Sequence, residues 1–134
     1  SQRRTEDAIH ELRSVLDKQS SNEDANYYLG GLLVQEARYE EAIPYLEKAR
    51  ALKPDSWSTL FYLGKAKLRM EHPAEAATLL QKAVALNPDE ASAYYQLGRA
   101  LQACGREQEA LRAFRRVQNL KAGAPKDAPI VGIR

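Results

Sequence analysis

The residue types that most often carry chemistry are few in this chain and far apart. His10 and His72 are the only histidines, and Cys104 is the only cysteine. A thiol nucleophile needs a base beside it, and neither histidine lies near Cys104 in the sequence. We therefore predict no catalytic residue and no enzymatic activity of the chain's own.

The acidic residues and the glycines do not indicate a ligand site either. Glu36, Glu40 and Glu41 gather at an expected turn between helices, where solvation of helix ends explains them better than metal binding. A single cysteine excludes an intramolecular disulfide and a cysteine-based zinc site. No glycine-rich phosphate loop is present. We predict no bound metal and no cofactor.

A more regular pattern joins aromatic and cationic residues. Tyr27, Phe61 and Tyr95 follow one another at equal intervals and should form an aromatic column. The same interval separates Lys65 from Arg99. Aromatic rings offer a large contact area at little entropic cost, and neighbouring cations attract carboxylates. Such residues suit an extended or helical peptide with apolar side chains and one or two carboxylates. Ordinary packing explains the three rings equally well.

The composition limits the kind of protein that could position these residues. Hydrophobic residues make up 44% and charged residues 28%, which is typical of a folded chain with a solvated surface. The net charge of +2 comes from interspersed acids and bases, so nucleic-acid binding is disfavoured. No apolar run approaches the roughly 20 residues of a membrane span. No apolar signal segment opens the chain, but it lacks an initiator methionine, so an upstream targeting signal stays open and a cytoplasmic location is slightly favoured.

The sequence repeats with a constant period, which is the interval from Gly30 to Gly64 and again from Gly64 to Gly98. Each of these glycines follows a leucine. Small residues recur at two fixed places after each glycine, with a valine at the last of these places, and a proline follows in the first two repeats. In order, the recurring residues after the glycines are Ala42, Ala76 and Ala110; Ala49, Ala83 and Val117; and Pro54 and Pro88.

Apolar residues at helical spacing predict two helices in each repeat. The leading helix of the first repeat should bury Leu29, Leu32 and Leu33, and the trailing helix Ala42, Ile43, Leu46 and Ala49. Gly30 and Ala42 are small where the two helices should approach closely. Pro54 and Pro88 should end the trailing helices, and Asp55 and Asp89 should cap the helices that follow. We expect helices over 5–19, 23–36, 39–52, 57–70, 73–86, 91–104 and 107–121.

This pattern resembles the tetratricopeptide repeat (TPR). The resemblance implies an all-α fold, a right-handed superhelix of antiparallel helix pairs with about 3.5 repeats. The second helix of a partial repeat would occupy residues 1–22, full repeats would occupy 23–56, 57–90 and 91–124, and an extended tail would occupy 125–134. Asn26, Lys67 and Ala122 depart from the aromatic, apolar and proline residues usual in the family, which leaves the local packing there open.

In that family the first helix of each repeat lines a concave face that binds proteins or peptides. The residues of this chain that would bind a peptide there are Tyr27, Tyr28, Phe61, Tyr62, Lys65, Arg69, Tyr95, Gln96 and Arg99. The places of the carboxylate clamp for chaperone C-terminal tails carry no matching residue, and neither do those of the asparagine ladder of glycosyltransferase arms. The resemblance implies a scaffold for an unidentified protein or peptide. The alternative is a substrate-recruiting or regulatory arm of a larger enzyme.

Each end of the chain carries a prediction of its own. Ile9, Leu12 and Leu16 should form an uncapped apolar stripe, so that the chain self-associates through its first helix or the intact protein continues upstream. At the other end, the apolar segment Pro129–Ile133 either docks on a groove or helix face or belongs to a passive tail. The passive tail is the simpler interpretation.

Overall fold

The computed structural model describes residues 2–123, and the regular structure in this part of the chain is α-helical throughout. In chain order the helices are α1 (Gln2–Lys18), α2 (Glu23–Gln35), α3 (Tyr39–Leu52), α4 (Trp57–Arg69), α5 (Pro73–Leu86), α6 (Ala91–Ala103) and α7 (Glu107–Lys121). The predicted helices are confirmed. The largest difference is at α1, which begins at Gln2 because the residues before position 5 include no helix breaker. None of these helices is long and apolar enough to cross a membrane.

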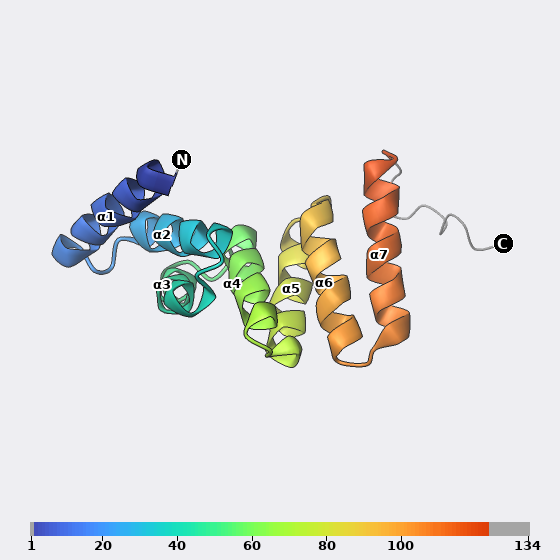
Figure 1. Cartoon of the computed structure of the whole chain (residues 1–134). Helices are drawn as coiled ribbons and strands as arrows, with labels where there is room; N and C mark the ends of the chain where they lie inside the picture. Colours follow the sequence, from blue (N-terminus) through green and yellow to red (C-terminus); the bar gives the residue numbers. More distant parts are fainter. Residues whose placement is uncertain (1, 124–134) are drawn as a thin grey trace.

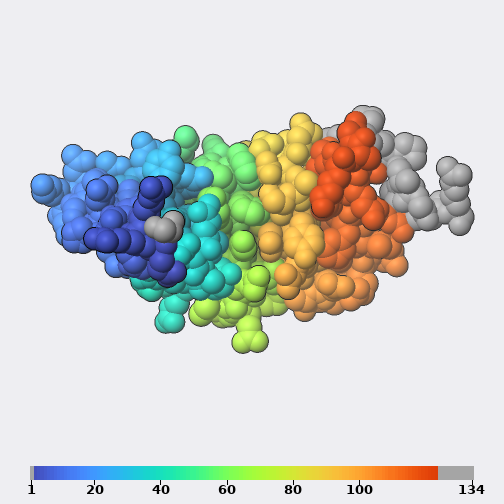
Figure 2. Space-filling view, turned by 45° about the horizontal axis from the view of Figure 1, so that its top comes forward, coloured from blue at the N-terminus to red at the C-terminus, as the bar shows by residue number. Residues whose placement is uncertain are grey.

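The helices form a solenoid of stacked pairs (Figure 1). α2 packs against α3, α4 against α5, and α6 against α7, while α3–α4 and α5–α6 contacts join consecutive pairs. α1 packs on α2. The leading helices α2, α4 and α6 also contact one another in order. Figure 2 shows the result in space-filling form, with the colours of the sequence following one another along the body. The predictions for the tail 125–134 fall outside the described residues.

Three glycines allow the two helices of each pair to approach closely. A Cβ added at Gly30 would lie 2.5 Å from Leu46 Cγ, and one at Gly64 would lie 2.6 Å from Leu80 Cγ. At Gly98 the added atom would meet the ring of Phe114 at 2.5 Å. The leading helix therefore accepts a large side chain of its partner at this place in every full unit, as the repeat pattern predicted.

The first helix is anchored by a residue that the sequence analysis placed at the surface. Ile9 is 1% exposed and belongs to the core, and Leu12 and Leu16 are half-buried against that core. The predicted uncapped stripe of these three residues is therefore wrong, because α2 covers the side of α1 that carries Ile9. Val15, at 39% exposed, is the open apolar residue of this helix. In the next pair, Leu32 is half-buried at the edge of the core rather than fully buried, and so is Ile43.

Each pair of helices is joined by the same turn. In the first, Arg38 N donates to Leu33 O at 2.8 Å and Ala37 N donates to Val34 O at 2.9 Å, the two bonds of a Schellman motif. Ala37 has a positive φ of 59°, and the equivalent residues of the next two units, Glu71 and Gly105, have φ of 66° and 77°. The turn thus repeats with the period of the sequence, and only its third copy has glycine at the left-handed position.

The helices that follow the prolines are not capped as predicted. α3 and α5 do end before Pro54 and Pro88, as expected. Asp55 and Asp89, however, are not the capping residues. The residue directly before α4 is Ser56, and the residue directly before α6 is Glu90. Ser56 caps α4 by accepting from Thr59 N at 3.3 Å, and Asn22 caps α2 in the same way.

Two departures from the family pattern have local compensation. Asn26 is 3% exposed, and its Nδ2 donates to Ser20 O at 3.0 Å and Asn22 O at 2.9 Å, so a buried amide replaces the usual aromatic side chain. Lys67 forms an ion pair with Glu75 at 3.2 Å. At both positions, polar contacts of the side chain replace the apolar packing that is usual in the family.

Arg116 is a structural residue that the sequence analysis missed. It is 8% exposed, its Nη2 lies 3.2 Å from Pro88 O and 3.4 Å from Asp89 Oδ1, and its guanidinium stands 5.7 Å from the centre of the Tyr94 ring. The side chain thereby ties α7 to the loop before α6, which explains why Asp89 faces a cation and not a helix N-terminus.

Candidate functional site

A line of five aromatic rings crosses from α2 to α4. The ring centroids of Tyr28 and Tyr27 are 5.2 Å apart, those of Tyr27 and Tyr62 6.0 Å, those of Tyr62 and Phe61 5.4 Å, and those of Phe61 and Trp57 6.1 Å. The rings meet edge to face or tilted, which is the favoured geometry for aromatic pairs. Tyr28 is 59% exposed and the other four are half-buried, so the line of rings borders solvent along its length.

Tyr62 is fixed at the centre of this arrangement by two residues of α2. A Cβ at Gly31 would lie 3.1 Å from Tyr62 Cε2, so the missing side chain leaves room for the ring. Gln35 Nε2 donates to Tyr62 Oη at 3.1 Å. Burial raises the pKa of the neighbouring Tyr27, and a hydrogen bond with Ser58 partly opposes that rise. These contacts favour the observed arrangement of the rings in the free chain.

The contacts differ from the aromatic column expected from Tyr27, Phe61 and Tyr95. Tyr27 meets Tyr62, the residue after Phe61, and Tyr95 meets Phe114 of α7 at 6.0 Å. A column of the three rings is therefore wrong, because α4 presents Tyr62, the residue after Phe61, to Tyr27 of α2, and Tyr95 packs on α7. The sequence analysis also missed Trp57, although its spacing of four residues from Phe61 places both on one side of α4.

Three cations lie beyond the rings on α4 and α6. Lys65 is half-buried, Arg99 is exposed, and Arg69 is exposed with its guanidinium 5.8 Å from the Tyr39 ring centre. Within residues 2–123, no carboxylate forms an ion pair with any of the three. Gln96, predicted to face the ligand, is only 9% exposed, and its Oε1 is buried without a hydrogen-bond partner.

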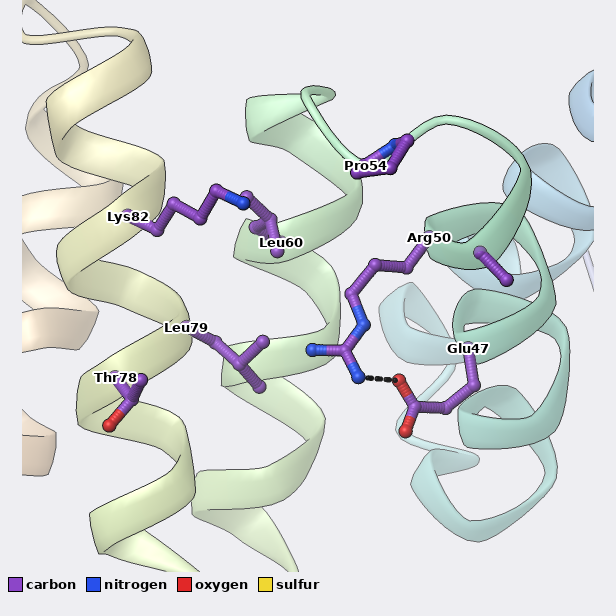
Figure 3. Close-up of a pocket in the computed structure, with 8 residues that line it drawn as sticks. Glu47, Arg50, Pro54, Leu60, Thr78, Leu79 and Lys82 are labelled. Carbon is purple, nitrogen blue, oxygen red and sulfur yellow. Dashed lines mark ion pairs between the residues drawn. The ribbon is translucent and has the colours of Figure 1, made fainter.

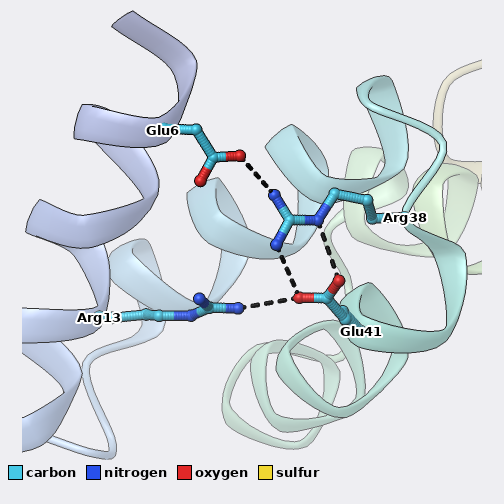
Figure 4. Close-up of polar contacts among 4 residues, drawn as sticks. All are labelled: Glu6, Arg13, Arg38 and Glu41. Atoms are coloured by element: carbon cyan, nitrogen blue, oxygen red, sulfur yellow. Dashed lines mark hydrogen bonds and ion pairs between the residues drawn. The ribbon is translucent and has the colours of Figure 1, made fainter. Parts of the chain in front are cut away.

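Several other arginines are paired, as a cluster at the joint of α1 and α3 illustrates (Figure 4). Arg38 binds Glu41 through two hydrogen bonds of 2.9 Å and reaches Glu6 at 2.9 Å, while Arg13 binds Glu41 at 3.0 Å. The hydrogen bonds from Arg38, followed by that from Arg13, hold the pKa of Glu41 below its ordinary value. This cluster secures α1 and includes none of the five rings.

Among residues 2–123, cavities recur between successive trailing helices, and another of about 530 Å³ lies at the turn between α2 and α3, beside Met70. One of about 430 Å³ lies between α3 and α5, over a floor that includes Leu60 and Leu79 (Figure 3). At its wall, Glu47 and Arg50 form an ion pair of 3.1 Å. Similar spaces of about 620 and 350 Å³ lie between α1 and α3 and between α5 and α7. Because such a furrow recurs at each junction, it follows from the stacking of pairs and does not single out a ligand site.

The family is decided by comparison with known sequences. A family model described as "Tetratricopeptide repeat" matches residues 62–128. The chain belongs to the tetratricopeptide-repeat family. A second model, "Regulator of microtubule dynamics protein 1-3", matches residues 25–92 of this TPR chain. No curated protein sequence matches it.

Solved structures of MamA are similar to this TPR chain. One titled "Crystal structure of MamA protein" has a TM-score of 0.84 and 28% identity, covering 91% of this chain and 67% of that one. Another, "Crystal structure of MamA", has a TM-score of 0.81 and 29% identity over 86% and 67% of the two chains. "MamA AMB-1 P212121" has a TM-score of 0.79 and 28% identity over 87% and 69%. The likeness extends over most of the solenoid.

The side chains most able to act in catalysis, two histidines and a cysteine, do not come together in this TPR chain. His10 is exposed on α1, His72 is exposed at the start of α5, and Cys104 is half-buried at the end of α6. Within residues 2–123, no group of three or more histidine, cysteine or acidic side chains could hold a metal ion. What the described residues do bring together is the line of five rings on α2 and α4.

Proposed function

We propose that this TPR chain is a protein-interaction scaffold without chemistry of its own, and that the concave face formed by α2, α4 and α6 binds a peptide segment of a partner protein. The family and the likeness to MamA support a scaffold. The choice of face is supported by the line of five rings described above.

The observation that carries the proposal is the combination of rings and cations on one set of helices. Tyr28 leaves most of its surface in water, although burying an aromatic ring is favourable by about 1.5–3 kcal/mol. Lys65 and Arg99 have no carboxylate partner among the described residues, whereas Arg13, Arg38 and Arg106 do. A surface with exposed rings and unpaired cations gains free energy when a peptide supplies apolar and acidic groups.

The test selects ligands without assuming a partner. Random peptides displayed on phage are selected on the purified chain, and the affinity of recovered peptides is measured for Tyr62→Ala and Arg99→Ala. We expect each substitution to weaken binding at least tenfold, because one removes a central ring and the other a cation. Arg99→Ala should keep nearly the wild-type stability because its side chain is exposed, and Tyr62→Ala should lose no more than about 1–2 kcal/mol because its ring is only half-buried.

A matched control lies on the opposite side of the pairs. Lys82→Ala removes an exposed cation of α5, beside the furrow between α3 and α5, and should leave peptide binding unchanged. Binding that survives both ring and cation substitutions but is lost in Lys82→Ala would place the partner in the furrow. Loss of several kcal/mol of stability in Tyr62→Ala and Arg99→Ala would show that these residues belong to the core.

A further inference from the structure

The two junctions between leading helices differ in chemistry at equivalent positions. At the first junction, Tyr62 of α4 lies over Gly31 of α2 and accepts a hydrogen bond from Gln35. One repeat later, the second junction has Gln96 in place of the tyrosine, Lys65 in place of the glycine and Arg69 in place of the glutamine. One junction is thus aromatic and the other is polar and cationic.

The aromatic junction is complete in the free chain and the cationic junction is not. Tyr62 has a ring neighbour on each side and a hydrogen-bond partner. Gln96 is nine-tenths buried, and its Oε1 lacks a partner. An unpartnered buried amide oxygen is costly, by about 1–3 kcal/mol. The unpartnered oxygen of Gln96 is an acceptor, so the cationic junction lacks a hydrogen-bond donor. A backbone N–H of a bound peptide could supply that donor once the Gln96 side chain turns toward it.

The charges on the concave face favour an acidic group of a ligand at the cationic junction and not at the aromatic junction. Lys65 and Arg99 occupy equivalent positions on α4 and α6, and Arg69 lies one turn further along α4. At the start of α2, by contrast, Glu23 and Asp24 stand together, and burial followed by the interaction with Asp24 raises the pKa of Glu23. A carboxylate is attracted to the α4/α6 end and repelled by the acidic end.

The distance between the two junctions sets the spacing of the ligand groups. Neighbouring packed helices are about 8–10 Å apart, so the ring junction and the cationic junction are separated by about one such step. An extended peptide advances about 3.3 Å per residue, so about three residues span that step. We infer that the face recognises an extended peptide whose aromatic or large aliphatic side chain contacts Tyr28 and Tyr62 and whose carboxylate, three residues away, lies between Lys65 and Arg99. This inference rests on the proposed peptide binding by the concave face.

The experiment compares peptides that differ only in spacing. Synthetic peptides in a serine–alanine background carry one phenylalanine and one glutamate at a separation of one, three or five positions, in both chain directions. Isothermal titration calorimetry measures their affinity for the full chain. We expect the separation of three to bind at least tenfold more tightly than the other two in one direction, and this preference to weaken as salt is raised.

Reversing the charges of Lys65 and Arg99 tests whether these residues bind the carboxylate of the peptide. The double variant with Lys65→Glu and Arg99→Glu should lose the preferred peptide at least tenfold and gain affinity for the same peptide carrying lysine in place of glutamate. Lys82→Glu serves as the control for a charge reversal elsewhere and should change neither affinity. Circular dichroism checks that all variants fold.

The outcomes separate this inference from the proposed function. Equal affinity for all three spacings, no measurable binding of any of the peptides, or no effect of the double charge reversal overturns the inference. If phage-selected peptides still lose affinity for Tyr62→Ala, the proposed binding of peptides by the concave face would remain supported. Selected peptides that bind Tyr62→Ala and Arg99→Ala as tightly as the wild type would instead overturn the proposed function.

Discussion

Gly30 and Gly31 are adjacent in α2 but face different neighbours. A Cβ at Gly30 would lie 2.5 Å from Leu46 Cγ and 3.3 Å from Leu46 N, so a backbone stands behind the side chain. A Cβ at Gly31 would meet only the edge of the Tyr62 ring, at 3.1 Å. Alanine in the middle of a helix is favoured over glycine by about 0.5–1 kcal/mol, so the outcome at each position depends on what the added methyl group displaces.

We predict consequences of different size for the two alanine substitutions. Gly30→Ala should lower the free energy of unfolding by about 1–3 kcal/mol, because it overpacks a close helix contact. Gly31→Ala should change it by less than about 1 kcal/mol, because the ring can shift and helix propensity compensates. Urea denaturation followed by circular dichroism measures both. A larger loss for Gly31→Ala would mean that the Tyr62 ring cannot move.

The types of the candidate site residues could be identified from the sequence, but their partners could not. The regular period of the repeat placed Tyr27, Tyr62 and Lys65 on leading helices, because helical repeats align equivalent positions. The contact between Tyr27 and Tyr62 depends on the space left by Gly31 and on the offset between stacked helices. A period in sequence does not contain that offset, which is why a column through Phe61 was expected instead.

At the scale of the element, the joint between α1 and α3 should respond to pH. Glu41 has a lowered pKa because Arg38 and Arg13 donate to it. Its contribution to stability is present above the unfolded pKa, near 4.5, and is lost as the pH falls through the lower, folded pKa. We expect the difference in melting temperature between the wild type and Glu41→Gln to be largest near neutral pH and to shrink below about pH 4.

The neighbouring Glu40 gives the control for that titration. It is exposed on the same turn and forms no ion pair among the described residues. Glu40→Gln should leave the pH dependence of melting close to that of the wild type. If both variants follow the same curve as the wild type, the cluster in Figure 4 contributes nothing measurable to the attachment of α1.

The repeated turn gives a second prediction for the elements. Gly105→Ala should destabilise the chain by about 1–2 kcal/mol, because a left-handed conformation places a Cβ against the backbone. Ala37→Gly, at the equivalent place in the first unit, should stabilise it by up to about 1 kcal/mol for the same reason. Thermal melts of the two variants check the signs. A loss of stability in Ala37→Gly would mean that the methyl group makes contacts that outweigh the strain.

The elements themselves were largely predictable, and the exceptions have local causes. Apolar periodicity and the prolines locate helix ends well because Pro54 and Pro88 disfavour helix at the residue before them. The caps were predicted less well, because Asp55 and Ser56 are both good capping residues and the choice depends on where α4 begins. Ile9 was assigned to the surface because the sequence does not tell which side of α1 faces α2.

For the whole molecule, the stacked architecture predicts unequal stability along the chain. Each helix contacts only its neighbours in the stack, so α1 has packed helices on one side while α4 and α5 have them on both. α1 also contributes one fully buried side chain, Ile9. We expect backbone amides of α1 to exchange with deuterium faster than those of α4 and α5, as measured by mass spectrometry.

The substitution Ile9→Ala should sharpen this gradient. Removing a buried isoleucine costs about 2–5 kcal/mol locally, which exceeds what the exposed ion pairs can offset. Exchange in α1 should then approach the rate of an unfolded chain, while protection of α5 and α6 stays nearly unchanged. A uniform loss of protection in all helices would mean that the described residues unfold as one cooperative unit.

The place of Trp57 gives the line of rings an optical label of its own. It is the only tryptophan in the chain, it stands at the first turn of α4, and its half-buried ring lies 6.1 Å from that of Phe61. Indole emission shifts with the polarity around the ring, so the spectrum of the unmodified chain reports on this face and on no other surface. Among the tyrosines, Tyr27, Tyr28 and Tyr62 belong to the same line of rings and lie close enough to pass excitation to it. A compound that covers these rings would therefore change the wavelength and the intensity of the tryptophan fluorescence, without any attached dye.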